Sequence, residues 1–149
     1  MTLLALDYGA KKVGVAKSDE QNRMALPLTT VRYEKREQLL ETLKSISVEQ
    51  GAERIIVGVP VSLSTGNNES IMRRVDLENK QMQEVLAFVE WLKNNIGLPV
   101  EVEDERLSTK MANNLLKGLV GTGPDDAVAA MLILQTYLDR KNSDITSHT

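Results

Sequence analysis

The chain contains no cysteine, and its single histidine, His148, lies next to the C-terminus. Disulfide bonds, thiolate metal sites and cysteine nucleophiles are therefore excluded. Only 3% of the residues are aromatic. Phe88 and Trp91 are expected to pack on a helix, so the sequence offers no array for stacking nucleic-acid bases. No apolar run approaches the roughly 20 residues that a membrane-spanning helix needs. Any metal site would have to be built from oxygen ligands.

The composition is that of an ordinary globular domain. Hydrophobic residues make up 42% and charged residues 26% of the 149 residues, which is enough chain to bury one core. The net charge of −3 argues against a generally basic surface for nucleic acid, but it leaves room for a local basic patch. The first predicted strand begins at the N-terminus without a charged leader and apolar segment before it, so we expect a cytoplasmic protein.

Hydrophobic periodicity predicts strands and helices in a definite order. We expect one domain over residues 1–138 and a flexible tail over residues 139–149, where no periodicity is visible. Pro27 suits an edge strand or the start of a strand, and Gly51 suits the end of a helix. Strands are predicted at residues 3–7, 13–16, 25–31, 54–59 and 100–103, a polar loop at 61–70, and helices around 39–46, 82–92, 108–119 and 124–138.

The order of these elements predicts the fold class. An antiparallel meander of three strands that feeds β-α-β crossovers gives an α/β fold with one mixed sheet covered by helices. The first strand should be central, because later strands pair on its far side. The strict alternation of valine and glutamate over residues 100–103 indicates that the last strand has a solvated face or lies at a sheet edge.

Acidic residues stand at the ends of three predicted elements. Asp7 ends the first strand, and Asp104 and Glu105 follow the last strand. Asp126 stands in the first turn of the last helix, where the helix dipole favours a carboxylate. Parallel strands end at the same edge of a sheet, so these groups should meet there. Hard oxygen ligands without histidine or cysteine suit Mg²⁺ or Mn²⁺.

Each acidic position also has a purely structural explanation. Asp7 could pair with Lys12 or Arg106 and hold a turn. Residues 104–106 could form a solvated charge run before a helix, and residues 125–126 could simply cap the last helix. A metal site is favoured because the three acidic positions occur together at compatible ends of the elements.

Four blocks stand out along the chain: LDYGAKKVGVA at residues 6–16, VGVP at 57–60, DERLST at 104–109 and DAVAAMLILQ at 126–135. In this order they resemble the YqgF/RuvX family, nucleases assigned to pre-16S ribosomal RNA and related to Holliday junction resolvases. The resemblance extends from about Leu3 to Tyr137, nearly the whole chain. DERLST, in the right order with the other three blocks, makes it highly specific.

The resemblance implies an RNase H-like fold, with a five-stranded sheet in the order 3-2-1-4-5 and an antiparallel second strand. It implies that Asp7, Glu105 and Asp126 are catalytic acids that bind Mg²⁺ or Mn²⁺. The implied activity is metal-dependent hydrolysis of nucleic-acid phosphodiester bonds, in processing the 5′ end of pre-16S rRNA during ribosome biogenesis. The expected partner is structured RNA or branched DNA, not a membrane, and the chain is expected to be a monomer or a homodimer.

This sequence departs from the family pattern at two places that matter for phosphate binding. Lys12 stands where the family usually has arginine, which keeps the charge but loses the two-pronged geometry. Residues 111–124, where the family commonly has a basic stretch, are shortened and carry only Lys117. Substrate binding is therefore assigned to cations elsewhere: Lys11, Lys12, Arg73, Arg74 and Arg106.

Three other functions stay open. A resolvase that cuts branched DNA would use the same chemistry but would need a dimer. A non-catalytic nucleic-acid-binding factor in ribosome assembly or transcription would fit the loss of the basic stretch. A phosphate-binding ATPase of the actin and sugar-kinase type also begins with an Asp-x-Gly hairpin. Such a protein needs two such domains, which 149 residues cannot supply.

Overall fold

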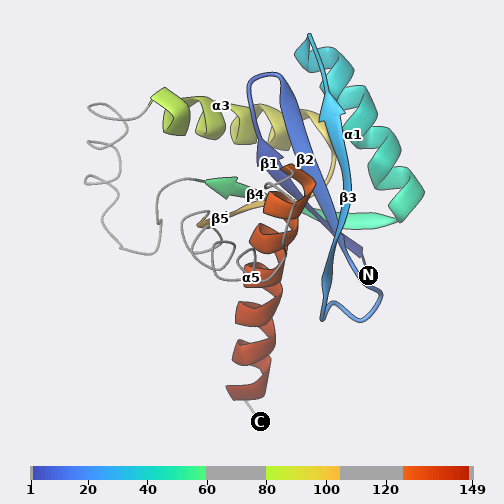
Figure 1. The fold of residues 1–149 in the computed structure, drawn as a ribbon, viewed down its shortest axis with the longest axis vertical. Coiled ribbons are helices and arrows are strands. Elements are labelled where there is room, and N and C mark those ends of the chain that lie inside the picture. Colours follow the sequence, from blue (N-terminus) through green and yellow to red (C-terminus); the bar gives the residue numbers. More distant parts are fainter. Residues whose placement is uncertain (1, 60–79, 105–125, 148–149) are drawn as a thin grey trace, which may run out of the picture.

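The structure is a computed structural model in which residues 2–59, 80–104 and 126–147 are described. Within these ranges the chain forms one mixed sheet with helices on both faces (Figure 1). The elements are β1 Thr2–Tyr8, β2 Lys12–Ser18, β3 Ala25–Arg32, α1 Arg36–Gln50, β4 Ala52–Val59, α3 Lys80–Asn95, β5 Val100–Asp104 and α5 Asp126–Ser147.

The sheet has the strand order β3-β2-β1-β4-β5. β1 pairs antiparallel with β2 and parallel with β4, and β4 pairs parallel with β5. β1 is therefore central, as the sequence predicted. The carboxyl ends of β1, β4 and β5 lie at the same edge of the sheet, and this edge receives Asp7 from β1.

β3 is the edge strand beside β2, which confirms the interpretation of Pro27. The register of the pair shifts between Val15 and Ala16, and Pro27 is the partner of Ala16. Proline has no backbone N–H to donate to a neighbouring strand. It therefore costs the sheet little stability at this position, in an edge strand next to a register irregularity.

Apolar side chains cover both faces of the sheet, because alternate residues of a strand point to opposite faces. One face packs against α1 and α3, and the other packs against α5. Phe88 and Trp91 pack in the first cluster, as the sequence predicted. The α5 face carries the alanines of β1 and β2, which allow the helix to lie close to the strands. The residues on that face include Leu3, Ala5, Ala16 and Ile56.

Two helix ends can be compared with the sequence prediction. α1 ends at Gly51, as predicted, and the φ of 64° at this residue is left-handed and suits glycine. α5 continues to Ser147, past the boundary predicted at residue 138. The extension is supported by a contact that hydrophobic periodicity does not reveal, because Arg140 forms an ion pair with Glu103 of β5.

Two predicted elements, the loop at 61–70 and the helix that starts at Ser108, lie outside the described residues. No helix in the described ranges is long and apolar enough to cross a lipid bilayer. Every buried side-chain polar atom in those ranges has a hydrogen-bond partner, so the polar groups of the interior are satisfied.

Candidate active site

Asp7 lies on the α5 face of the central strand. Leu3 and Ala5 of β1 pack under α5, and the alternation of side chains places Asp7 on the same face two residues later. Its register partner on β2 is Gly14. The carboxylate therefore stands at the strand end, beside a residue that has no side chain.

Gly14 allows the start of α5 to come into direct contact with the sheet. A β-carbon at Gly14 would lie 1.9 Å from the carbonyl oxygen of Asp126 and 2.9 Å from the backbone nitrogen of Ala127. Such a carbon would overlap both atoms, so only glycine permits this approach. The first residue of α5 is thus packed against the residue that pairs with Asp7.

Asp7 and Asp126 line one cleft of about 410 Å³ at this edge of the sheet. The structure therefore brings together two of the three acids that were predicted to meet, one from the first strand and one from the last helix. Glu105, the third, lies outside the described residues. Within the described residues no group of three or more acidic or histidine side chains could hold a metal ion. The cleft is also lined by Tyr8, Gly9, Ala10, Lys11, Lys12 and Arg32.

Lys12 forms an ion pair with Asp126, with 3.1 Å between Nζ and Oδ2. The two side chains are 50% and 30% exposed, so water screens the pair and its net contribution to stability is below about 1 kcal/mol. The sequence offered Lys12 as a partner of Asp7, whereas the ion pair seen at Lys12 involves Asp126. Carboxylate oxygens from two elements are the kind of donor set that Mg²⁺ or Mn²⁺ prefers, and Lys12 competes with such an ion for the Asp126 carboxylate.

Three cations of the described residues line the cleft, and the sequence predicted two of them, Lys11 and Lys12. Arg32 is the third and was missed. It is the register partner of Lys12, so the two side chains project from the same face of neighbouring strands. The strand predicted from the sequence ended at Val31, and the register shift between Val15 and Ala16 hides the pairing of residue 32 with residue 12 from a count that starts at the hairpin turn. The other predicted cations, Arg73, Arg74 and Arg106, lie outside the described residues.

Tyr33 attaches the end of β3 to the turn between β1 and β2. Its hydroxyl donates to the carbonyl of Gly9 at 2.7 Å, and its backbone N–H donates to the carbonyl of Lys11 at 3.1 Å. Burial and the adjoining Tyr8 raise the pKa of Tyr33 above its ordinary value of 10.0, so the hydroxyl stays protonated and remains a donor. Two hydrogen bonds therefore fix the turn that carries Lys11.

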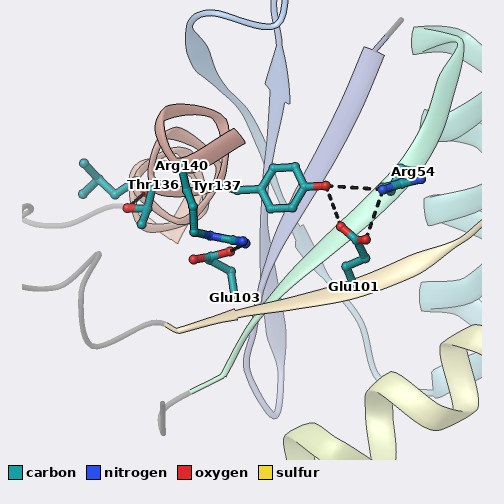
Figure 2. A network of polar contacts seen from close by, with 7 residues as sticks. Arg54, Glu101, Glu103, Thr136, Tyr137 and Arg140 are labelled. Atoms are coloured by element: carbon teal, nitrogen blue, oxygen red, sulfur yellow. Dashed lines mark hydrogen bonds and ion pairs between the residues drawn. The ribbon is translucent and has the colours of Figure 1, made fainter. Parts of the chain in front are cut away.

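The glutamates of β5 face α5 (Figure 2). Tyr137 donates to Oε2 of Glu101 at 2.5 Å, and Arg54 of β4 contacts Oε1 at 3.0 Å. Arg140 pairs with Glu103 at 2.5 Å, and the Glu103 side chain is only 6% exposed. The prediction that β5 lies at a sheet edge is confirmed, but the alternative of a solvated glutamate face does not hold for Glu103.

These contacts change the acidity of two of the groups. Burial acts to raise the pKa of Glu101, but the hydrogen bond from Tyr137 and the charge of Arg54 outweigh it and hold that pKa below the ordinary value of 4.5. Burial and the neighbouring Glu101 raise the pKa of Tyr137. A charged Glu101 and a neutral Tyr137 therefore coexist at neutral pH. Their bond attaches α5 to the strand that leads, in the sequence, to Glu105.

Comparison with known proteins identifies the family. The family model described as "RuvX: Holliday junction resolvase" matches residues 1–140. A protein of Rickettsia peacockii (strain Rustic) named "Putative pre-16S rRNA nuclease" is 37% identical over 142 residues, which cover 92% of this chain and 85% of that protein. A protein of the same name from Rickettsia conorii (strain ATCC VR-613 / Malish 7) is also 37% identical, with the same coverage.

Solved structures agree with the fold. T. thermophilus RuvC in complex with a Holliday junction substrate has a TM-score of 0.57 at 15% identity, covering 95% of this chain and 96% of that chain. The fowlpox virus Holliday junction resolvase has a TM-score of 0.51 at 12% identity, covering 95% and 99%. The predicted RNase H-like sheet of order 3-2-1-4-5 is thereby confirmed. The family match over residues 1–140 and the identity to the Rickettsia proteins show that this chain belongs to the RuvX family.

Proposed function

We propose that this chain is a metal-dependent nuclease that hydrolyses phosphodiester bonds of RNA and processes the 5′ end of pre-16S ribosomal RNA in the cytoplasm. The family match and the names of the relatives support a nuclease. The observation that carries the proposal is the cleft that Asp7 and Asp126 line together. Two carboxylates from distant parts of the chain meet there beside cations suited to phosphate.

Asp7, Glu105 and Asp126 would hold one or two Mg²⁺ or Mn²⁺ ions, since carboxylate oxygens are the ligands that these ions prefer. When bound, such an ion stabilises the charge that develops on the phosphate and lowers the pKa of the attacking water. The chain's own contribution is geometric. Gly14 sets the distance of Asp126 from β2, and the register of β1 with β2 sets the place of Asp7.

Cations beside the carboxylates would bind the phosphates of the substrate. Lys11 and Lys12 line the cleft, and the sequence adds Arg73, Arg74 and Arg106 as further phosphate-binding residues. Contacts of this kind position a nucleic acid without reading its sequence. Recognition of one particular RNA would therefore depend on its shape.

The test is a cleavage assay on a pre-16S rRNA fragment that carries its 5′ leader, with Mg²⁺ or Mn²⁺. Asp7→Asn and Asp126→Asn should each lower the cleavage rate by at least about 100-fold, because a lost ligand should cost more than the 10- to 100-fold of a lost outer-shell partner. Asp139→Asn removes an exposed carboxylate elsewhere on α5 and should leave the rate unchanged. Circular dichroism establishes that each variant is folded. A folded Asp7→Asn variant that cleaves at the wild-type rate would exclude this site.

A second candidate is cleavage of four-way DNA junctions, which the description of the family and the RuvC-like fold favour. Symmetric cutting of two strands requires a dimer. The same assay on a junction, with sedimentation to measure the oligomeric state, separates the two functions. Paired cuts by a dimer would favour the resolvase, and RNA cleavage by a monomer would favour rRNA processing. Binding of either substrate without cleavage in saturating Mn²⁺ would favour a non-catalytic factor.

A further inference from the structure

We infer that Arg32, at the end of β3, binds a phosphate adjacent to the one that is cleaved. The substrate backbone would then run from the carboxylates past the end of β2 to the end of the edge strand β3. The inference rests on the proposed nuclease function and adds to it a substrate contact and a path. Among the described cations that line the cleft, Arg32 is the one arginine, and its strand lies farther from β1 than β2 does.

The position of Arg32 follows from the strand register. It lines the same cleft as Asp7 and Asp126, and it is the register partner of Lys12 on β2. Two strand spacings, roughly 10 Å, separate the backbones of β3 and β1. A phosphate at the carboxylates and a phosphate at Arg32 would therefore be neighbours on one strand and not the same group.

Lys12 and Arg32, the two cations on this face, differ in whether a carboxylate of the described residues pairs with them. Lys12 is engaged by Asp126 at 3.1 Å. Arg32 is exposed, and no carboxylate of the described residues forms an ion pair with it. A guanidinium presents two parallel N–H donors that match two oxygens of a phosphate, which an ammonium cannot do. Arg32 is therefore the better phosphate ligand of this neighbouring pair.

The backbone that carries Arg32 is fixed on the side of the cleft. The next residue, Tyr33, is bonded to the β1–β2 turn through its N–H, at 3.1 Å from the carbonyl of Lys11, and through its hydroxyl, at 2.7 Å from the carbonyl of Gly9. The strand register adds the pairing of Arg32 itself with Lys12 of β2. A side chain on a fixed backbone loses less conformational freedom on binding than one on a loose loop.

Nucleic-acid binding without cleavage tests the inference. A fluorescent single-stranded RNA and a DNA of the same sequence are titrated with protein in EDTA, and fluorescence anisotropy gives the dissociation constant over a range of KCl concentrations. Arg32→Gln should weaken binding about ten-fold, as expected for one charged hydrogen-bonded contact. It should also reduce the slope of log K against log salt by about 0.7, the value for one phosphate contact on a single strand. Arg32→Lys should restore the slope but only part of the affinity.

Arg23 offers a matched control. It is an exposed arginine in the turn at the other end of the β2–β3 hairpin, so Arg23→Gln changes the net charge by the same amount away from the cleft. Its affinity and salt dependence should equal those of the wild type. In a cleavage assay Arg32→Gln should raise KM with little change in kcat, since the contact is made to a phosphate that does not react.

The outcomes separate this inference from the proposed function. Wild-type affinity in Arg32→Gln overturns the inference and leaves the nuclease proposal intact. An equal loss in Arg23→Gln overturns it as well, because binding would then follow net charge alone. A loss confined to Arg32→Gln, in a protein that binds but never cleaves, supports the phosphate contact and counts against the nuclease. If the wild type binds neither RNA nor DNA, both fail.

Discussion

Gly14 of β2 and Asp126 of α5 are in backbone contact, so close that a β-carbon at Gly14 would lie 1.9 Å from the carbonyl oxygen of Asp126. Gly14 is also the register partner of Asp7. One glycine therefore sets the relation between the two carboxylates of the cleft, although Asp126 is far from it in the sequence.

Gly14→Ala should displace the start of α5 and reduce both stability and activity. We expect a loss of about 1–3 kcal/mol in the free energy of unfolding, the range for overpacking a tight contact. Cleavage should fall by about 100-fold, since a displacement of roughly 1 Å in a catalytic group has that effect. Urea unfolding and the rate at saturating metal measure the two quantities.

Gly58→Ala is the matched control for this variant. A β-carbon at Gly58 would lie 2.3 Å from Cδ1 of Ile133, the far end of a flexible side chain that can move aside. This variant should lose some stability and keep its cleavage rate under conditions where it is folded. Equal losses of activity in both variants would mean that general destabilisation, and not the position of Asp126, limits the reaction.

Removing the ammonium of Lys12 should strengthen metal binding. Lys12 lies 3.1 Å from Asp126, so it competes with any cation for that carboxylate. We expect Lys12→Met to bind Mn²⁺ about two- to five-fold more tightly, in line with the 0.2–1 kcal/mol of an exposed ion pair. Electron paramagnetic resonance of free Mn²⁺ measures the affinity without substrate. Lys11→Met removes a neighbouring charge of the same cleft and should have a smaller effect. If the two variants are equal, the ion pair has no specific role.

Arg140→Met should destabilise the protein because it leaves Glu103, a carboxylate that is only 6% exposed, without its partner. Removing one member of a buried pair costs about 3–5 kcal/mol, and we expect about 2 kcal/mol here because Arg140 itself is half exposed. Adding Glu103→Gln should recover part of the loss, since no buried charge remains. Thermal unfolding of the single and double variants at neutral pH gives the comparison. A double variant less stable than Arg140→Met would contradict the assignment.

The bond between Glu101 and Tyr137 should make stability depend on pH in the acid range. The pKa of Glu101 is held below 4.5 in the folded protein. Its contribution to stability is therefore fully present above pH 4.5 and is lost as the pH falls through the folded value. The difference in unfolding free energy between wild type and Glu101→Gln should be largest at neutral pH and shrink as the pH falls below the ordinary carboxyl pKa of 4.5. Glu90→Gln, an exposed change on α3, should show no such trend.

The sequence predicted much of the frame because the relevant signals are local. The apolar runs and their order were enough to make β1 central and to place Asp7 at its end. The same reasoning placed Asp126 at the start of the last helix, and both residues line the cleft. Pro27 and Gly51 marked an edge strand and a helix end through backbone chemistry that each residue carries by itself.

What the sequence did not predict depends on contacts between distant segments. Arg32 comes to the cleft because it pairs with Lys12, and the register shift between Val15 and Ala16 in the β2–β3 strand pair hides this pairing from the sequence. Glu103 is polar and sits in an alternating strand, so its burial by Arg140 could not be read from periodicity. The same contact extends α5 beyond residue 138, where no apolar pattern supports a helix.

The cleft joins the first strand of the fold to its last described helix, and this order has a consequence for synthesis. While the ribosome is making the chain, the β1–β2–β3 meander can form early, but the second carboxylate is absent until α5 has emerged and docked on the sheet. On the proposed assignment of Asp7 and Asp126 as catalytic acids, a partly made chain would therefore not cut the RNA around it. Competence to cut would arrive only with the completed fold.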